Sequence, residues 1–490
     1  MRVLYLAAIV ALVMGALLLA IALGGWFLFR WAIARVEQGM SGSSRSSLLE
    51  LFFGLQTIRL EELFLLLQRT AHAKPAQHPM GSPTRIHWLD EFTWDPATLD
   101  PPAISRRARV HLEVSLGPRA LRPLTLAFPV VIAPMGYGIA LNRVTKVALA
   151  QASALAGIAT NSGEGPFLPA ERAFAQCWIL QYGRGPWDHQ DETLRIADMV
   201  EIQVGQGSEA GTGIEKSIKR LPSRVRQAMD HPTRKFHIHG GFPWPLPAVI
   251  QRIRRINPEV PVGIKLPASN HLEQDLALML QWGVDVITFD GNEAASSSSP
   301  AVISDHFGIA TAEAIARAHR WLVLHKRRQD VSLIAAGGAR SASDIATLLA
   351  LGADTVAVGT AILFAATQNQ VARVLPFYGP SRLVFAEPSL PRRQELNLDK
   401  AVESCLNWLK ATQSELALIA QALGVDRIQA VSAHHLVART DRAQHVLQLA
   451  QVQHERLAEW IGHVRLMTDH YATLIPILTQ QWAQLSRWSF

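Results

Sequence analysis

The stretch Val331–Ala361 constrains the fold more than any other part of this chain. Its apolar beginning, Val331–Ala336, has the length of a buried strand. Ser341 or Ser343 can then cap a helix, and a turn leads into a second apolar run, Thr355–Val358. Strand, helix and strand in this order indicate a βαβ unit with parallel strands.

Glycines follow both strands of this unit. Gly337 and Gly338 end the first strand, and Gly359 stands before Thr360 at the end of the second. Glycine lets backbone N–H groups approach a ligand closely, and phosphate is the anion that such N–H groups usually bind. We therefore predict a phosphate site here, while a plain βαβ turn remains the alternative.

Apolar segments of strand length recur along the chain, mostly separated by segments of helix length. The eight segments are Phe128–Ala133, Gly157–Thr160, Cys177–Gln181, Met199–Val204, Val260–Leu266, Val284–Phe289, Val331–Ala336 and Thr355–Val358. Two lead-in strands are expected before them, at Ala108–Ser115 and Leu124–Ala127. This series predicts an α/β fold of the (β/α)₈ TIM type, with a doubly wound open sheet as the alternative.

The amino-terminal segment predicts a membrane anchor. Val3–Phe29 is a run of 27 residues without a charge, which is long enough for a transmembrane helix and too long for a signal peptide. Arg30, Arg35 and Arg45 follow it, so the positive-inside rule favours a single-pass protein of the inner (cytoplasmic) membrane with its catalytic domain in the cytoplasm.

Four regions are expected along the chain. Residues 1–30 form the anchor, and residues 31–84 contain an amphipathic helix, Ser47–Thr70, that lies on the bilayer or on a partner, followed by a linker. Residues 85–390 form the barrel. Residues 391–490 form a carboxyl-terminal helical region whose aromatic-rich end can line the barrel, a homo-oligomer interface or the bilayer.

Composition excludes some classes of site. The net charge of +7 is modest for 490 residues, and the basic clusters fall in helical segments, so no nucleic-acid partner is predicted. The two cysteines, Cys177 and Cys405, are too few for a disulfide framework or a metal quartet and are expected to be buried free thiols. His237 and His239 alternate as on a strand without a third ligand, so no metal site is predicted.

Four polar residues near strand ends carry the predicted chemistry. Gln181 and Lys265 end two strands, where a lysine can stabilise the reduced, anionic form of an electron-rich ring. Glu164 and Asp290 lie in glycine turns and can orient a substrate or transfer protons. The alternatives are a barrel-mouth lysine that points to water and carboxylates that only form turns.

With these residues in place, the chain resembles the flavin-binding synthase domain of glutamate synthase, especially the membrane-anchored, stand-alone proteins of the FMN-binding glutamate synthase family. The resemblance covers Arg85 to Arg439. Its motifs are APMGYG (133–138), ATNSGEG (159–165), EIQVGQG (201–207), GIKL (263–266), FDG (289–291), SDHFG (304–308), AAGGARSASDIATLLALGAD (335–354) and LDKAVESCLNWLK (398–410).

The resemblance implies a barrel that holds FMN at the carboxyl ends of its strands. The phosphate would lie near Gly337, Gly338, Gly359 and Thr360, and Gln181 and Lys265 would face the flavin ring. The remaining implied cofactor contacts are Pro134, Met135, Gly136 and Ser162. The family reaction forms glutamate from 2-oxoglutarate and ammonia through 2-iminoglutarate, which reduced FMN reduces by hydride transfer. The implied substrate is therefore an amino acid or a 2-oxo acid.

The departures from the family concern the electron donor and the substrate. Leu363–Pro376 lacks the family's cysteines, so no iron–sulfur cluster is expected and electrons would come from a nicotinamide, a partner or a quinone. Family lysines are replaced by Gln203 and Glu209, and a glycine–lysine pair by Ala339-Arg340. A serine-rich run, 294–300, replaces a glycine-rich loop, and no glutaminase domain supplies ammonia. The rival hypothesis is therefore a degenerate barrel that acts as a binding or scaffold protein.

Overall fold

The computed structural model describes residues 19, 23–31, 33–34, 88–99, 101–451 and 476, except for gaps at 186, 188–189, 208–211, 219–220, 222, 228–234, 241–244, 295–298, 376–379 and 387–395. The chain forms two compact units, residues 1–76 and 77–490.

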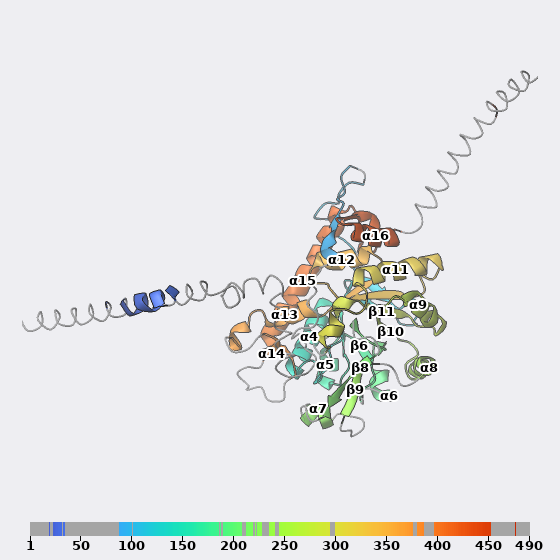
Figure 1. Ribbon diagram of the computed structural model, residues 1–490. Coiled ribbons are helices and arrows are strands. Elements are labelled where there is room, and N and C mark those ends of the chain that lie inside the picture. The colour runs from blue at the N-terminus through green and yellow to red at the C-terminus, as the bar shows by residue number, and fades with distance from the viewer. Residues whose placement is uncertain are drawn as a thin grey trace, which may run out of the picture. The chain divides into compact units, whose positions relative to one another are not determined.

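The second unit contains a closed barrel of eight parallel strands (Figure 1). Its strands are β4 (Val130–Ile132), β5 (Ala159–Asn161), β6 (Cys177–Tyr182), β7 (Met199–Gln203), β10 (Val262–Pro267), β11 (Val286–Asp290), β12 (Ser332–Ala336) and β13 (Thr355–Val358). Strand β4 pairs with both β5 and β13, so the sheet closes. The predicted barrel is confirmed, and the open-sheet alternative is wrong.

Helices follow the strands around the outside of the barrel. They are α4 (Arg143–Ala156), α5 (Pro169–Phe174), α6 (Asp191–Arg195), α8 (Leu246–Ile256), α9 (Leu272–Gln281), α10 (Ala301–Ser304), α11 (Thr311–Leu324), α12 (Ala342–Ala350) and α13 (Thr360–Thr367). Of the two predicted caps of α12, Ser341 forms a capping box with Asp344, whereas the Ser343 hydroxyl accepts a hydrogen bond from the Trp94 indole at 3.1 Å.

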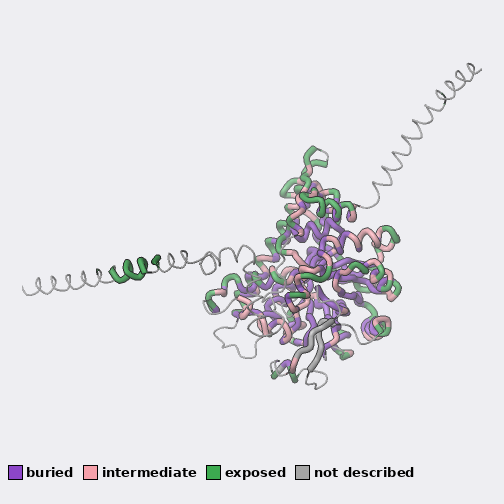
Figure 2. The backbone as a smooth tube through the Cα atoms, viewed as in Figure 1, coloured by how far each residue is buried: buried purple, intermediate pink, exposed green. Residues whose placement is uncertain are grey.

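A β-hairpin closes the amino-terminal end of the barrel. The predicted lead-in strands are shorter than expected and form β2 (Val114–Leu116) and β3 (Leu124–Leu126), which pair antiparallel. Leu116 and Leu126 are fully buried against residues that come early in the barrel strands. Figure 2 shows the buried core that this packing and the outer helices create. The other end of the barrel is therefore the end at which polar side chains can gather.

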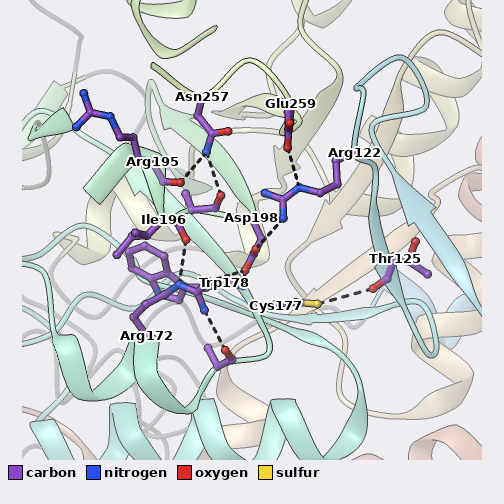
Figure 3. Close-up of polar contacts among 12 residues, drawn as sticks. Arg122, Thr125, Arg172, Cys177, Trp178, Arg195, Ile196, Asp198, Asn257 and Glu259 are labelled. Atoms are coloured by element: carbon purple, nitrogen blue, oxygen red, sulfur yellow. Dashed lines mark hydrogen bonds and ion pairs between the residues drawn. The ribbon is translucent and has the colours of Figure 1, made fainter. Parts of the chain in front are cut away.

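Ion pairs join the chain segments around this hairpin (Figure 3). Asp198 accepts a hydrogen bond from the backbone N–H of Trp178 at 2.9 Å and lies 3.4 Å from the Arg172 guanidinium. Cys177 is only half-buried, contrary to the prediction, and burial raises the pKa of its thiol. Cys405 is buried as predicted. Because the N-terminal face of such barrels usually serves stability, we assign no catalytic role to these ion pairs or to Cys177.

Two segments lie outside the repeating pattern. Strands β8 (Thr212–Ser217) and β9 (Lys235–Gly240) form an antiparallel hairpin after β7 that also includes α7 (Ser223–Gln227). The carboxyl-terminal region begins with α15 (Leu398–Ala422), which packs on α4 and α13. It is not wholly helical as predicted, because β14 (Leu436–Ala438) pairs with β1 (Phe92–Trp94) before α16 (Asp441–Ala450).

The amino-terminal unit contributes part of a helix to the described residues. Its side chains at Leu23, Trp26, Phe27, Leu28, Phe29 and Trp31 are 54–68% exposed. Among the residues that the structure describes, no helix combines the length and the apolar character needed to cross a bilayer. Most of the predicted anchor Val3–Phe29, the amphipathic helix Ser47–Thr70 and the residues after 451, apart from 476, lie outside the described residues.

One partly buried histidine on α11 is expected to make the stability of the protein depend on pH. His319 accepts a hydrogen bond from Arg328 at 3.2 Å. Burial and this cation lower the pKa of His319 from 6.5 to about 4. Between pH 6.5 and 4, His319 therefore binds a proton in the unfolded chain but stays neutral in the folded chain. The free energy of unfolding decreases as the pH falls through this range. At about 1.4 kcal/mol per tenfold change in proton affinity, the loss is about 3 kcal/mol.

The measurement is the difference between wild type and His319→Gln in urea unfolding at each pH. Buried carboxyl groups such as Glu171, whose pKa is raised by burial, act in the opposite direction and cancel in this difference. A difference that stays constant between pH 6.5 and 4 would show that His319 does not titrate in this way.

Candidate active site

The inner face of the barrel changes from apolar to polar towards the carboxyl ends of its strands. Apolar side chains such as Ile179, Met199 and Val286 form the layer above the hairpin. Further along, Asn161, Gln181, Glu201, Lys265, Thr288 and Asp290 are each at most 3% exposed. A buried polar layer costs free energy unless it is hydrogen-bonded, so its retention at the usual active-site end points to a functional site.

Two predicted catalytic residues meet in this layer. Lys265 on β10 and Asp290 on β11 form an ion pair with 2.8 Å between Nζ and Oδ2. The same carboxylate oxygen accepts a hydrogen bond from Gly207 N at 3.2 Å. Burial raises the pKa of Asp290 to about 6, although Lys265 lowers it. This pair can therefore hold a positive charge at a fixed place and exchange a proton close to neutral pH.

The third predicted catalytic residue, Glu164, holds the loop after β6. Its Oε1 accepts hydrogen bonds from the backbone N–H groups of Arg184 at 3.1 Å and Gly185 at 2.9 Å. A Cβ on Gly183 would come within 2.8 Å of this carboxylate. Glu164 is thus 2% exposed and shapes the rim of the barrel. Its catalytic role stays a prediction.

The predicted ring-side residues come together on two neighbouring loops. The Ser162 hydroxyl accepts a hydrogen bond from Gln181 N at 2.9 Å, which joins the ends of β5 and β6. Met135 and Gly136 follow Pro134 after β4 and lie against the same loop, since a Cβ on Gly136 would be 1.9 Å from the carbonyl oxygen of Glu164. Only glycine permits this approach.

The predicted phosphate end offers backbone donors. Gly337 and Gly338 have φ of +116° and +77°, which favour glycine. Gly359 caps α13, which starts at Thr360. Among the described residues, no hydrogen bond is found for the backbone N–H groups of these four residues. Unpartnered N–H groups at two adjacent strand ends fit the phosphate of a cofactor such as FMN.

Two charged side chains near these glycines are already engaged. Arg340 lies 3.1 Å from Asp344 and 2.5 Å from Asp90, so its charge is shared between two carboxylates. Glu293 comes within 3.7 Å of where a Cβ on Gly338 would stand and accepts hydrogen bonds from Thr311 N and Oγ1. Burial raises the pKa of Glu293, which favours its neutral form.

A family model for the conserved region in glutamate synthase matches residues 106–426, which is most of the chain. The chain belongs to the glutamate synthase family. The match runs from the segment before β2 to the segment after α15, so it includes the whole barrel. This membership makes the chain an oxidoreductase of the glutamate synthase type.

Two relatives and one solved structure illustrate the similarity. The glutamate synthase large subunit-like protein of Rhizobium meliloti is 28% identical over 394 residues, 75% of this chain and 88% of the relative. The archaeal-type glutamate synthase [NADPH] of Thermotoga neapolitana is 28% identical over 335 residues, 66% of this chain and 64% of the relative. A double mutant of flavocytochrome b2 with pyruvate bound is 13% identical, with a TM-score of 0.47, covering 76% of this chain and 83% of that one.

Sequence reasoning missed two charged residues of this glutamate synthase family member. Lys146 on α4 is 1% exposed; its Nζ donates to the carbonyl oxygens of Asn161 and Ser162, both at 2.9 Å, and lies 2.8 Å from Glu171. Lys146 is the only charged residue from 144 to 163, which is the signal that could have revealed it. Glu201 similarly interrupts the apolar strand MVEIQV.

Proposed function

We propose that this family member binds FMN and reduces a 2-oxo acid in the presence of ammonia, with 2-oxoglutarate and glutamate as the substrate and product implied by the family. The observation that supports this proposal most strongly is the group of unpartnered N–H donors at Gly337, Gly338, Gly359 and Thr360, on the same barrel end as Lys265 and Asp290. Bound FMN would supply a hydride donor, which the protein side chains lack.

The side chains would orient the reactants and manage charge and protons. Gly337, Gly338, Gly359 and Thr360 would hold the phosphate, and the two neighbouring loops that contain Met135, Gly136 and Ser162 would border the ring. Lys265 would stabilise negative charge on the reduced ring. Asp290, whose pKa is about 6, would accept or donate a proton at the substrate. Ammonia and a 2-oxo acid lose water to give an imine, and hydride transfer plus one proton gives the amino acid.

Purified full-length protein is expected to be yellow and to carry about one FMN per chain, because a single barrel mouth offers one site. Absorbance between 350 and 500 nm, together with chromatography of the released flavin, measures the content. Protein that stays colourless after incubation with FMN would contradict the proposal and favour the scaffold hypothesis.

The substrate is tested after chemical reduction of the bound flavin. Adding 2-oxoglutarate and ammonia together should reoxidise the flavin faster than either compound alone. If 2-oxoglutarate and ammonia together do not reoxidise the flavin although FMN is bound, the cofactor assignment stands and the substrate assignment is wrong. Reduction by NADPH, which the name of the Thermotoga relative includes, can be followed in the same sample.

We further propose that the amino-terminal segment anchors the chain in the inner membrane with the barrel in the cytoplasm. The exposed aromatic side chains from Trp26 to Trp31 and the uncharged run before them support this proposal. The full-length chain should stay in the membrane fraction after a carbonate wash, whereas a chain that starts at Gln77 should not. Release of the full-length chain by carbonate would contradict a spanning anchor.

A further inference from the structure

Glu201 is the centre of the polar layer inside the barrel. It lies on β7 with 2% of its surface exposed. Its Oε1 accepts hydrogen bonds from Asn161 Nδ2 at 2.9 Å and Gln181 Nε2 at 3.0 Å, and its Oε2 accepts one from the Thr288 hydroxyl at 2.8 Å. One carboxylate therefore joins side chains from β5, β6 and β11.

These hydrogen bonds fix the orientation of two carboxamide groups. A carboxylate only accepts hydrogen bonds, so both amides must turn their NH₂ groups towards Glu201. The oxygen of Asn161 then accepts a hydrogen bond from Gly163 N at 2.9 Å, which shapes the loop that lies against Met135 and Gly136. The oxygen of Gln181 has no hydrogen bond among the described residues.

We propose that Glu201 is a positioning residue, which holds Gln181 so that its side-chain oxygen accepts a hydrogen bond from a ligand N–H group at the ring end of the site. This inference rests on the proposed function, since the N–H group belongs to the FMN ring there. The property of Glu201 that matters is the distance that its carboxylate can span, and its negative charge is secondary.

Two substitutions separate reach from charge. Glu201→Gln removes the charge but keeps an oxygen within reach of Asn161 and Gln181, and its NH₂ group can donate to Thr288. Glu201→Asp keeps the charge but is one methylene shorter, so its carboxylate cannot span the same distances. Thr288→Val is the matched control, because it removes a hydrogen bond to Glu201 without freeing either amide.

FMN affinity is measured by fluorescence titration of the full-length protein after flavin removal. Glu201→Asp should weaken FMN binding about tenfold, the upper end of the effect of one lost hydrogen bond between neutral groups, and should shift the visible absorption of the bound flavin. Glu201→Gln and Thr288→Val should stay within about threefold of wild type. Stronger binding by Glu201→Asp than by Glu201→Gln would overturn the inference, as would equal losses in Glu201→Asp and Thr288→Val.

A measurement without flavin separates this inference from the proposed function. In a double-mutant cycle of urea unfolding, Glu201→Asp and Gln181→Leu should be coupled by about tenfold in the unfolding equilibrium constant, because each substitution removes the same contact. Additive effects would overturn the inference even if FMN binds. If wild type takes up no FMN, the proposed function and the ligand assignment to Gln181 both fail, while the cycle still decides whether Glu201 holds Gln181.

Discussion

Replacing Lys265 with methionine is expected to lower the free energy of unfolding by about 3 to 5 kcal/mol and to slow flavin-dependent turnover by about 100-fold or more. The ammonium group is 2.8 Å from Asp290, and the two residues are only 3% and 1% exposed. Its loss leaves a buried carboxyl group without a cation. Methionine preserves the length of the side chain, so the result reports the charge. Urea unfolding and stopped-flow absorbance measure the two effects.

The double variant Lys265→Met with Asp290→Asn separates stability from chemistry. It removes both charges, so it should regain most of the lost stability but not the turnover. In the single variant the pKa of Asp290 rises above its present value of about 6. Because a neutral carboxyl group needs no cation, and the carboxyl group of the variant takes up its proton at a higher pH than that of wild type, the stability deficit should shrink as the pH falls towards 6. A deficit that is independent of pH would contradict the ion pair.

Replacing Lys146 with methionine is expected to cost about 3 to 5 kcal/mol of stability and to weaken FMN binding about tenfold or more. Its Nζ satisfies two carbonyl oxygens and the Glu171 carboxylate, all within 2.9 Å. Without it the loop at Asn161 and Ser162, which borders the proposed ring site, loses its support. Unfolding in urea and flavin titration measure the two losses.

Lys146→Met combined with Glu171→Met is the control for the loop. This pair of substitutions removes the buried charge as well as its partner, so stability should largely return. The carbonyl oxygens of Asn161 and Ser162 still lack a donor, so FMN affinity should stay low. Recovery of both properties would mean that Lys146 only neutralises Glu171 and does not position the loop.

The barrel could be predicted from sequence because each strand carries its own signal. An apolar run that ends in glycine or a polar residue can be recognised as a strand without knowing which strands lie beside it. Eight such runs in succession predict the barrel. Lys265 and Asp290 could be placed near the carboxyl ends of their strands for the same reason. Their mutual contact is a consequence of the parallel pairing of β10 with β11.

Features that depend on distant partners could not be predicted. Spacing alone did not choose between Ser341 and Ser343 as the cap of α12, because the Trp94 side chain that binds Ser343 lies 249 residues away. Lys146 stands out in the sequence as a single charge in an uncharged segment, but its partners could not be predicted. Glu171 and the two carbonyl oxygens come close to it only in the folded chain. Strand β14 is three residues long and stands among helices, so its pattern is too short to recognise.

The pairing of β1 with β14 has a consequence for biosynthesis. Strand β1 ends at Trp94 and β14 begins at Leu436, so 341 residues, 95–435, separate a strand from its partner. At about 5 to 20 residues per second, a ribosome needs about 20 to 70 s to make that segment. During this interval all eight barrel strands emerge while β1 has an open edge. The last pairing therefore forms only after α15 has left the ribosome, and a nascent chain released early lacks the strand that completes this sheet.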